Sequence, residues 1–158
     1  MNPVDYLLYY KRATAYLSLQ RHQPALQDFQ HVLTLTNAPP PAVHLHIAKI
    51  HAKDGQFAHA KTAARLYASQ TPSAADAEVA DILFKLGEAE VAAKKAERAR
   101  RAGLWTACVE AATLALQVAS HASEIRGTRA ECGIAGGDME LGVGDLRRVF
   151  VYASFILD

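Results

Sequence analysis

The sequence has 158 residues, and 51% of them are of hydrophobic types, so the chain is long enough to bury a core as one domain or as a short solenoid. Its 17 basic and 16 acidic residues give a formal net charge of +1, which excludes a chain whose charge alone would attract nucleic acid or an anionic membrane. Two cysteines, Cys108 and Cys132, are too few for a disulfide scaffold and match no zinc-binding spacing, so they leave the redox compartment open.

The segment YYKRATAYLSLQRHQPALQDF, residues 9 to 29, is predicted to form two helices around a tight break at Gln20 to Gln23. It matches the tetratricopeptide pattern, W-x2-L-G-x2-Y followed by A-x3-F, without the final proline. The matching residues are Tyr9, Arg12, Ala13, Tyr16, Ala25 and Phe29. In such a pair the small residues let the two helices approach closely, and the aromatic residues fill the space beside them.

The same frame recurs along the rest of the chain. The second copy, 35 residues on, has His44, Ile47, Ala48, His51, Gly55, Ala60, Ala64 and Pro72. The third copy has Ala96, Gly103, Trp105, Cys108 and Ala112, and the fourth, 34 residues later, has Ala130, Gly137, Gly142 and Leu146. We therefore predict an all-α fold, a tetratricopeptide-repeat superhelix, or α-solenoid, of about four helix pairs with a long connecting helix.

The long connector follows from the spacing between the second and third copies, which exceeds one repeat by about fourteen residues. This stretch lacks proline and is rich in Ala, Glu and Lys, so it predicts one helix from about Ala74 to Arg101, with Ser73 as N-cap and Asp76 as capping-box acid. Two subdomains would then be joined by a rigid helix. The predicted organisation is two helix pairs in 4–72, the long helix in 73–101, which is also the first helix of repeat three, the second helix of repeat three in 102–121, a degenerate fourth repeat in 122–150, and a divergent tail in 151–158.

Three stretches carry a more specific resemblance: YYKRATAYLSLQRHQPALQDFQHVL, GLWTACVEAATLAL and EIRGTRAECGIAGGDMELGVGDL. With the long connector between them, they resemble the endoplasmic-reticulum-lumenal J-domain co-chaperones with tetratricopeptide repeats, a family once described as a kinase inhibitor. The likeness covers about residues 4 to 148, and RAEC at Arg129 to Cys132 is its most particular element. That family has three repeats per subdomain, so the chain would correspond to a fragment with the second and third repeats of one subdomain and the first two of the next.

The resemblance implies a protein of the endoplasmic reticulum lumen that binds unfolded client proteins and passes them to an Hsp70 chaperone. The chain itself shows no signal peptide and no His-Pro-Asp motif of a J domain, so a cytoplasmic location is the alternative and Hsp70 stimulation is not assigned to these residues. The alternative function is a generic tetratricopeptide scaffold that docks one specific protein or peptide partner.

Ligands of such solenoids usually contact the concave face of the first helices. In this frame that face consists of Leu7, Tyr10, Thr14 and Leu17 in repeat one and of Leu45, His46, Lys49 and Ala52 in repeat two. The face is mostly apolar, which suits exposed hydrophobic segments of unfolded chains better than a charged peptide tail. The alternative is that these residues pack against a neighbouring repeat or the long helix.

Other features favour structural roles. His44 and His51 occupy packing positions of the repeat, which favours packing over metal binding, and Cys108 is expected to be a buried thiol, with a bond to Cys132 as the less favoured alternative. The run KKAERARR is expected to be a solvated helix face rather than a nucleic-acid site. No phosphate loop, nucleophile elbow or metal triad appears, so we expect neither enzyme activity nor a cofactor.

The C-terminal part departs from the repeat pattern in two ways. GGDMELGVGDL places four glycines where a helix should pack, and each interior glycine costs roughly 1 kcal/mol relative to alanine, so a weakly folded fourth repeat is expected. The apolar stretch VFVYASFIL is about half the length of a membrane-spanning helix, so no membrane insertion is expected.

The repeat frame makes one direct stability prediction. Replacing Ala48 with leucine should reduce the free energy of unfolding by ~1–3 kcal/mol, because the larger side chain overpacks a close contact between helices. Thermal denaturation of Ala48→Leu measures this, and a midpoint equal to that of the parent would contradict the frame.

Overall fold

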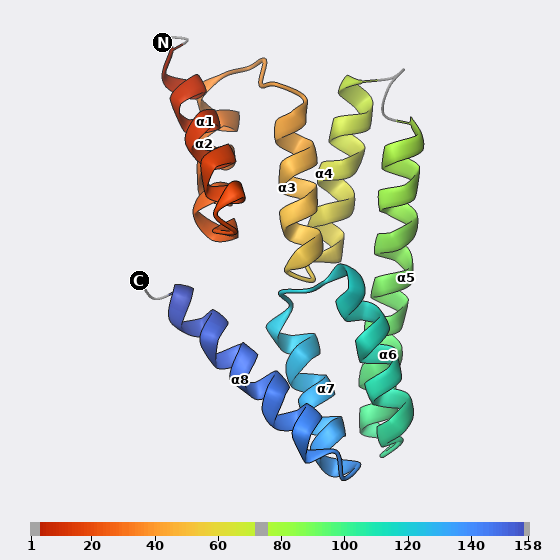
Figure 1. The fold of residues 1–158 in the computed structure, drawn as a ribbon. Coiled ribbons are helices and arrows are strands. Elements are labelled where there is room, and N and C mark those ends of the chain that lie inside the picture. Colours follow the sequence, from red (N-terminus) through yellow and green to blue (C-terminus); the bar gives the residue numbers. More distant parts are fainter. Residues whose placement is uncertain (1–3, 72–75, 157–158) are drawn as a thin grey trace. The chain divides into compact units, whose positions relative to one another are not determined.

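The computed structural model describes residues 4–71 and 76–156, and all regular structure in these residues is helical (Figure 1). The helices are α1 Val4–Ser18, α2 His22–Leu35, α3 Ala42–Lys53, α4 Phe57–Gln70, α5 Asp76–Arg101, α6 Trp105–Val118, α7 Ser123–Ala135 and α8 Met139–Ile156. The all-α prediction is confirmed for the part of the chain that the structure describes. None of the helices in these two ranges is both long and apolar enough to cross a membrane.

The turn inside each helix pair has the same backbone conformation. Gln20, Gly55, Gly103 and Gly137 all have positive φ, between 59° and 92°, and they occupy one position of the repeat frame. Glycine adopts this left-handed conformation without steric cost, which explains its presence in three of the four turns. The turn residue therefore repeats with the same period as the packing residues.

Small residues at two frame positions lie in the core of every pair. On the first helices these are Ala13, Ala48, Ala96 and Ala130, and on the second helices Ala25, Ala60, Cys108 and Gly142. All eight are buried. Helix backbones approach closely only where side chains are this small, so these positions set the distance between the helices of a pair.

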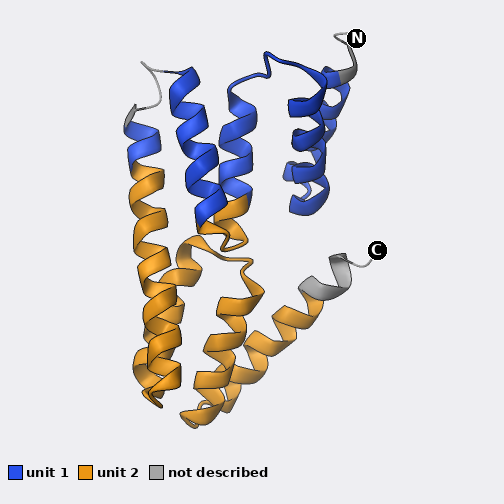
Figure 2. Ribbon diagram, turned by 180° about the vertical axis from the view of Figure 1, so that it is seen from behind, with its two compact units in different colours: residues 1–50, 58–80 blue, residues 51–57, 81–158 orange. Residues whose placement is uncertain are grey.

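The chain divides into two compact units (Figure 2). Unit 1 comprises residues 1–50 and 58–80, and unit 2 comprises residues 51–57 and 81–158. The turn 51–57 belongs to unit 2, and within this unit the backbone N–H of His121 donates a hydrogen bond of 2.8 Å to the carbonyl oxygen of Lys53. The repeat frame did not anticipate this grouping, because it assigned the turn to the second helix pair.

Helix α5 spans 26 residues and contributes to both units. Pro72, the predicted end of repeat two, and Ser73, the predicted N-cap of this helix, lie outside the described residues, as does the side chain of Asp76. In the basic run at its C-terminal end, Glu97 accepts hydrogen bonds of 2.8 Å from both Arg100 and Arg101. These bonds, first that of Arg100, lower the pKa of Glu97 to about 2, so these basic side chains pair with an acid on their own helix.

The two cysteines correct a prediction. Cys108 on α6 and Cys132 on α7 form a disulfide, with their Cα atoms 6.1 Å apart. The expectation of a buried thiol was wrong about the chemistry, although both residues are fully buried. Cys108 occupies the small-residue position of α6, and this position faces α7 at the level of Cys132. The disulfide therefore links the second helix of repeat three to the first helix of repeat four.

The glycines of the fourth repeat have a packing role that the sequence did not reveal. Helices α7 and α8 pack on each other, and a methyl group at Gly142 would overlap the side chain of Ile134 and lie 3.1 Å from the carbonyl oxygen of Ala130. By contrast, a methyl group at Gly144 would meet no atom within 4 Å. At Gly142 the intrinsic cost of glycine in a helix is thus offset by the close contact that it permits.

This contrast predicts opposite effects of one substitution at two sites in α8. Gly142→Ala should lower the free energy of unfolding by ~1–3 kcal/mol, because the added methyl group overpacks the contact with α7. Gly144→Ala, the matched control, should raise it by ~0.5–1 kcal/mol, because alanine is the better helix former and has free space. Chemical denaturation of both variants measures the difference, and equal effects would contradict the assigned role of Gly142.

Candidate functional site

The predicted binding face lies on α1 and α3. Leu7 and Lys49 are exposed, whereas Tyr10, Thr14, Leu17, Leu45 and His46 are half-buried. These seven residues belong to unit 1, and Ala52 belongs to unit 2. The apolar members with accessible surface are therefore Leu7, Leu17 and Leu45.

Two of the predicted face residues pack on one buried aromatic ring. The ring of Phe29 on α2 lies 6.0 Å from that of Tyr10, edge to face, and 5.1 Å from that of His46, stacked with an interplanar angle of 13°. Burial lowers the pKa of His46, and the charge of Lys49 lowers it further, so the imidazole is neutral at pH 7. Tyr10 and His46 thus connect α1 and α3 through α2, and only part of each side chain remains for a ligand.

The polar members of the face have partners within the protein. The ammonium group of Lys49 donates a hydrogen bond of 3.1 Å to Glu78 on α5, and both side chains are about half exposed. The hydroxyl group of Thr14 donates to the carbonyl oxygen of Lys11 in its own helix. Contact with the long helix was the alternative to ligand binding for these residues, and Lys49 makes such a contact through its ion pair with Glu78.

His44 is buried, as predicted from its packing position, and burial lowers its pKa. Within residues 4–71 and 76–156 no three His, Cys, Asp or Glu side chains come together in a way that could hold a metal ion.

Two repeats share an ion pair that the sequence reading missed. In repeat one the guanidinium group of Arg12 makes two hydrogen bonds of 2.7 Å to the carboxylate of Asp28. In repeat four Arg129 makes two bonds, of 2.6 and 2.7 Å, to Asp145. In each pair the arginine and the aspartate are sixteen residues apart, and the two pairs occupy the same positions of the repeat frame. An arginine before the small residue of the first helix, with an acid sixteen residues later, was the available signal.

Asp145 is the most deeply buried charge among the described side chains of unit 2, and two arginines contact it. Besides Arg129, Arg126 donates a bond of 3.2 Å to the carboxylate and a second bond to the carbonyl oxygen of Ser120. Burial alone would raise the pKa of Asp145, but the hydrogen bonds and charges of Arg129 and then of Arg126 outweigh it, so the pKa lies below its ordinary value. Arg129 also donates to the hydroxyl group of Thr113 on α6. The cluster thus connects α6, α7 and α8.

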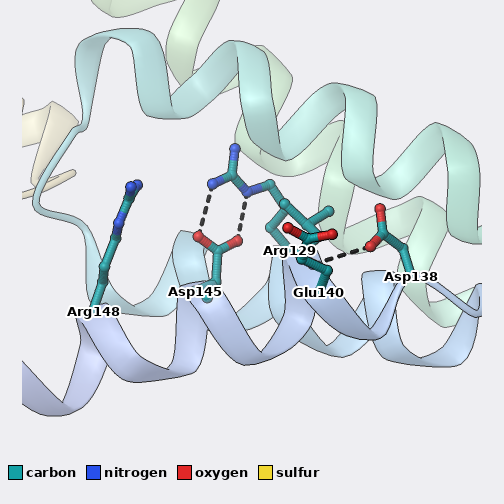
Figure 3. Close-up of a pocket in the computed structure, with 7 residues that line it drawn as sticks. Arg129, Asp138, Glu140, Asp145 and Arg148 are labelled. Carbon is teal, nitrogen blue, oxygen red and sulfur yellow. Dashed lines mark hydrogen bonds and ion pairs between the residues drawn. The ribbon is translucent and has the colours of Figure 1, made fainter.

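The cluster borders a surface hollow of about 340 Å³ on α7 and α8 (Figure 3). Arg129 points at Asp145 and binds it directly, while Asp138 accepts a bond of 3.0 Å from the backbone N–H of Leu141. Arg129 and Asp145, which both line the hollow, therefore bind each other, which is the arrangement of a joint between helices rather than of a catalytic acid and base.

The comparisons with known proteins agree with the repeat assignment. No protein-family model matches the chain. It is 41% identical over 149 residues to the tetratricopeptide repeat and J domain-containing co-chaperone DNJ1 of Cryptococcus neoformans and 28% identical over 147 residues to human DnaJ homolog subfamily C member 3. The first match covers 94% of this chain and 28% of the relative, and the second covers 92% and 29%. The chain thus spans less than a third of these relatives.

A solved structure shows the same fold. The crystal structure of the P58(IPK) TPR domain superposes with a TM-score of 0.86 and 26% sequence identity, over 96% of this chain and 42% of that chain. The predicted tetratricopeptide solenoid is therefore confirmed. The chain is a tetratricopeptide segment homologous to part of the co-chaperones that combine these repeats with a J domain.

The buried cluster generates a stability prediction. Asp145→Asn should lower the free energy of unfolding by ~3–5 kcal/mol, because it leaves the buried Arg126 and the half-buried Arg129 without their shared counter-charge. Asp28→Asn, the matched control, should cost only ~1–2 kcal/mol, because the side chain of Arg12 is 57% exposed and can turn to water, whereas that of Arg126 is 7% exposed.

The pH dependence of stability tests whether the charge of Asp145 is what stabilises the cluster. The pKa of Asp145 in the folded protein lies below its ordinary value of 3.8. The contribution of the Asp145 carboxylate to the free energy of unfolding is therefore fully present above about pH 4, and it is lost as the pH falls through the folded pKa. The difference between the parent and Asp145→Asn should therefore shrink below pH 4 in urea denaturation. A difference that stays constant down to pH 2 would show that charge is not its cause.

Proposed function

We propose that this chain is a non-catalytic tetratricopeptide segment that binds unfolded or hydrophobic polypeptide segments and that it works as a co-chaperone with an Hsp70 system. The observation that carries the proposal is the accessible apolar surface of Leu7, Leu17 and Leu45 on two first helices of unit 1, in a chain homologous to part of known co-chaperones. Homology supports the proposed class of function, and the apolar surface supports the proposed kind of ligand.

The chemistry of this surface favours an extended apolar ligand. Burying apolar area contributes about 25 cal/mol per Å² without fixed directions, so such a surface accepts many different sequences. The one cation of the predicted face, Lys49, is engaged by Glu78. Tyr10, Thr14 and His46 add hydrogen-bonding groups at the edge but no charge that would fix a terminal carboxylate.

We further propose that the chain resides in the endoplasmic reticulum lumen. The disulfide between Cys108 and Cys132 supports an oxidising compartment, since such bonds are rare in cytosolic proteins. A cytoplasmic location is the alternative, and there the two cysteines would be reduced. The Hsp70 partner is proposed from the relatives, whose names include a J domain or a DnaJ homologue.

The proposal predicts that the purified chain suppresses the aggregation of two unrelated denatured proteins, measured by light scattering. A Leu7→Ser, Leu45→Ser variant should lose most of this activity, because it removes two apolar contacts at the proposed face. Leu66→Ser is the matched control, since Leu66 is similarly exposed to Leu7, at 45% against 41%, but lies on a second helix. Circular dichroism must show equal helicity in all three proteins.

The two functional classes give different results in this assay. Suppression of both clients by the parent and the control, with loss in the double variant, supports the proposed binding of unfolded chains. If the well-folded parent suppresses neither client, the proposal is wrong and a scaffold for one specific partner becomes the better interpretation. Equal loss in the control would contradict the location of the face.

A further inference from the structure

Helices α7 and α8 form a hairpin that is held together by its own bonds. Asp145 on α8 accepts hydrogen bonds from Arg126 and Arg129, which both lie on α7. The close contact at Gly142 also joins these two helices, and Arg126 donates a further bond to the carbonyl oxygen of Ser120, directly before α7. All these contacts would persist if the hairpin moved as one body, so they do not hold it on α6.

The joint between α6 and α7 is built mainly from small side chains. The buried residues of α6 are Cys108, Ala111, Ala112, Ala115 and Leu116, and those of α7 are Arg126, Ala130, Cys132 and Gly133. Larger apolar side chains at this joint are Ile125, half-buried against the cluster with Ala112, and Trp105, half-buried beside Gly136. Because hydrophobic stabilisation grows with the apolar area that is buried, such a joint gains little from each residue.

The polar bonds from the hairpin to α5 and α6 lie at accessible positions. Arg100 on α5 donates a hydrogen bond of 3.0 Å to Glu131 on α7, whose side chain is 57% exposed. Arg129 donates an exposed bond of 3.1 Å to the hydroxyl group of Thr113 on α6. Water competes with both bonds, so each restrains the hairpin only weakly.

The disulfide is the strong link across this joint. Cys108 and Cys132 are separated by 24 residues, so the bond closes a loop that contains the α6–α7 turn. If the hairpin left α6, the bond would still keep Cys132 beside Cys108, which restricts the opened state and disfavours it. Both cysteines are 0% exposed, so a reductant reaches the sulfur atoms only when the joint opens.

We propose that this disulfide makes the docking of the α7–α8 hairpin on α6 depend on the redox state of the surroundings. While the bond is intact the hairpin stays on α6. When the bond is reduced the hairpin opens as one body, whereas unit 1 keeps its fold. The inference rests on contacts within unit 2, so it depends neither on the proposed client binding in unit 1 nor on the proposed location.

The reductant of this switch is a dithiol. One of its thiolates attacks a sulfur atom of the opened Cys108–Cys132 bond, which breaks and leaves a mixed disulfide and one free cysteine. The second thiol of the reductant then displaces the remaining cysteine and closes a disulfide within the reductant. Two electrons and two protons thereby pass to Cys108 and Cys132, and oxidation by a disulfide-containing oxidant reverses the step.

Hydrogen exchange of the full 158-residue chain, with and without dithiothreitol, tests the proposal. After reduction the amides of α7 and α8 should exchange roughly 100-fold faster, because the opened hairpin is no longer tethered, while those of α2 and α3 in unit 1 should not change. Trp105, the only tryptophan of the chain, lies at the joint, so its fluorescence should shift to the red.

A variant without the bond separates its loss from other effects of the reductant. Cys108→Ala, Cys132→Ala should exchange like the reduced parent, and dithiothreitol should change it no further. Equal protection of α7 and α8 in the oxidised and reduced parent overturns the proposal. So does faster exchange in α2 and α3 together with α7, which would show that the bond stabilises the whole chain. Faster exchange in α8 with α7 still protected would contradict opening of the hairpin as one body.

Discussion

The close approach of two helix backbones at one small residue on each helix is the constraint on which this structure depends. Ala13, Ala48, Ala96 and Ala130 are all buried, and each lies in a pair whose second helix has its own buried small residue. Because the distance between the helices is set there, larger side chains at the other frame positions make similar contacts in each helix pair. The four positive-φ turn residues follow from the same constraint, since a tight reversal is needed to bring the second helix back onto the first.

This constraint explains which parts of the structure were predictable from the sequence. Small residues, turn residues and helix formers repeat with a period, and a period can be read without coordinates. The disulfide and the Arg129–Asp145 pair could not be read in the same way, because each depends on which side of one helix faces a neighbour. Cys108 had the right position in the frame, but nothing local to Cys132 identifies it as the residue opposite. The packing role of Gly142 was hidden for the same reason, since propensity alone counts only the cost of glycine.

The helix pairs place different residue types at the same two positions of the repeat frame. Repeats one and four place an arginine and an aspartate at the two frame positions sixteen residues apart, whereas repeat two has Ile47 and Ala63 there, both buried. An ion pair at this place demands bidentate geometry and so fixes the rotation of the two helices more tightly than an apolar contact does. In repeat four the disulfide links α7 to α6, and the buried Asp145 links α7 to α8. The glycine-rich fourth repeat is thereby held by directional bonds at a place where repeat two has an apolar contact.

In the predicted binding face, packing inside the protein reduces the surface that is left for a ligand. Tyr10 and His46 were selected as ligand contacts, yet both rings pack on Phe29, so the geometry that makes the face rigid also uses part of its surface. Frame positions alone could not separate the two roles, because a concave residue and a packing residue can occupy the same turn of one helix. The apolar residues that keep accessible surface, Leu7, Leu17 and Leu45, lie on helices whose relative position this aromatic stack fixes. A face that is preorganised in this way would lose little conformational entropy on binding, so under the proposed function a modest apolar area would suffice to hold a client segment reversibly.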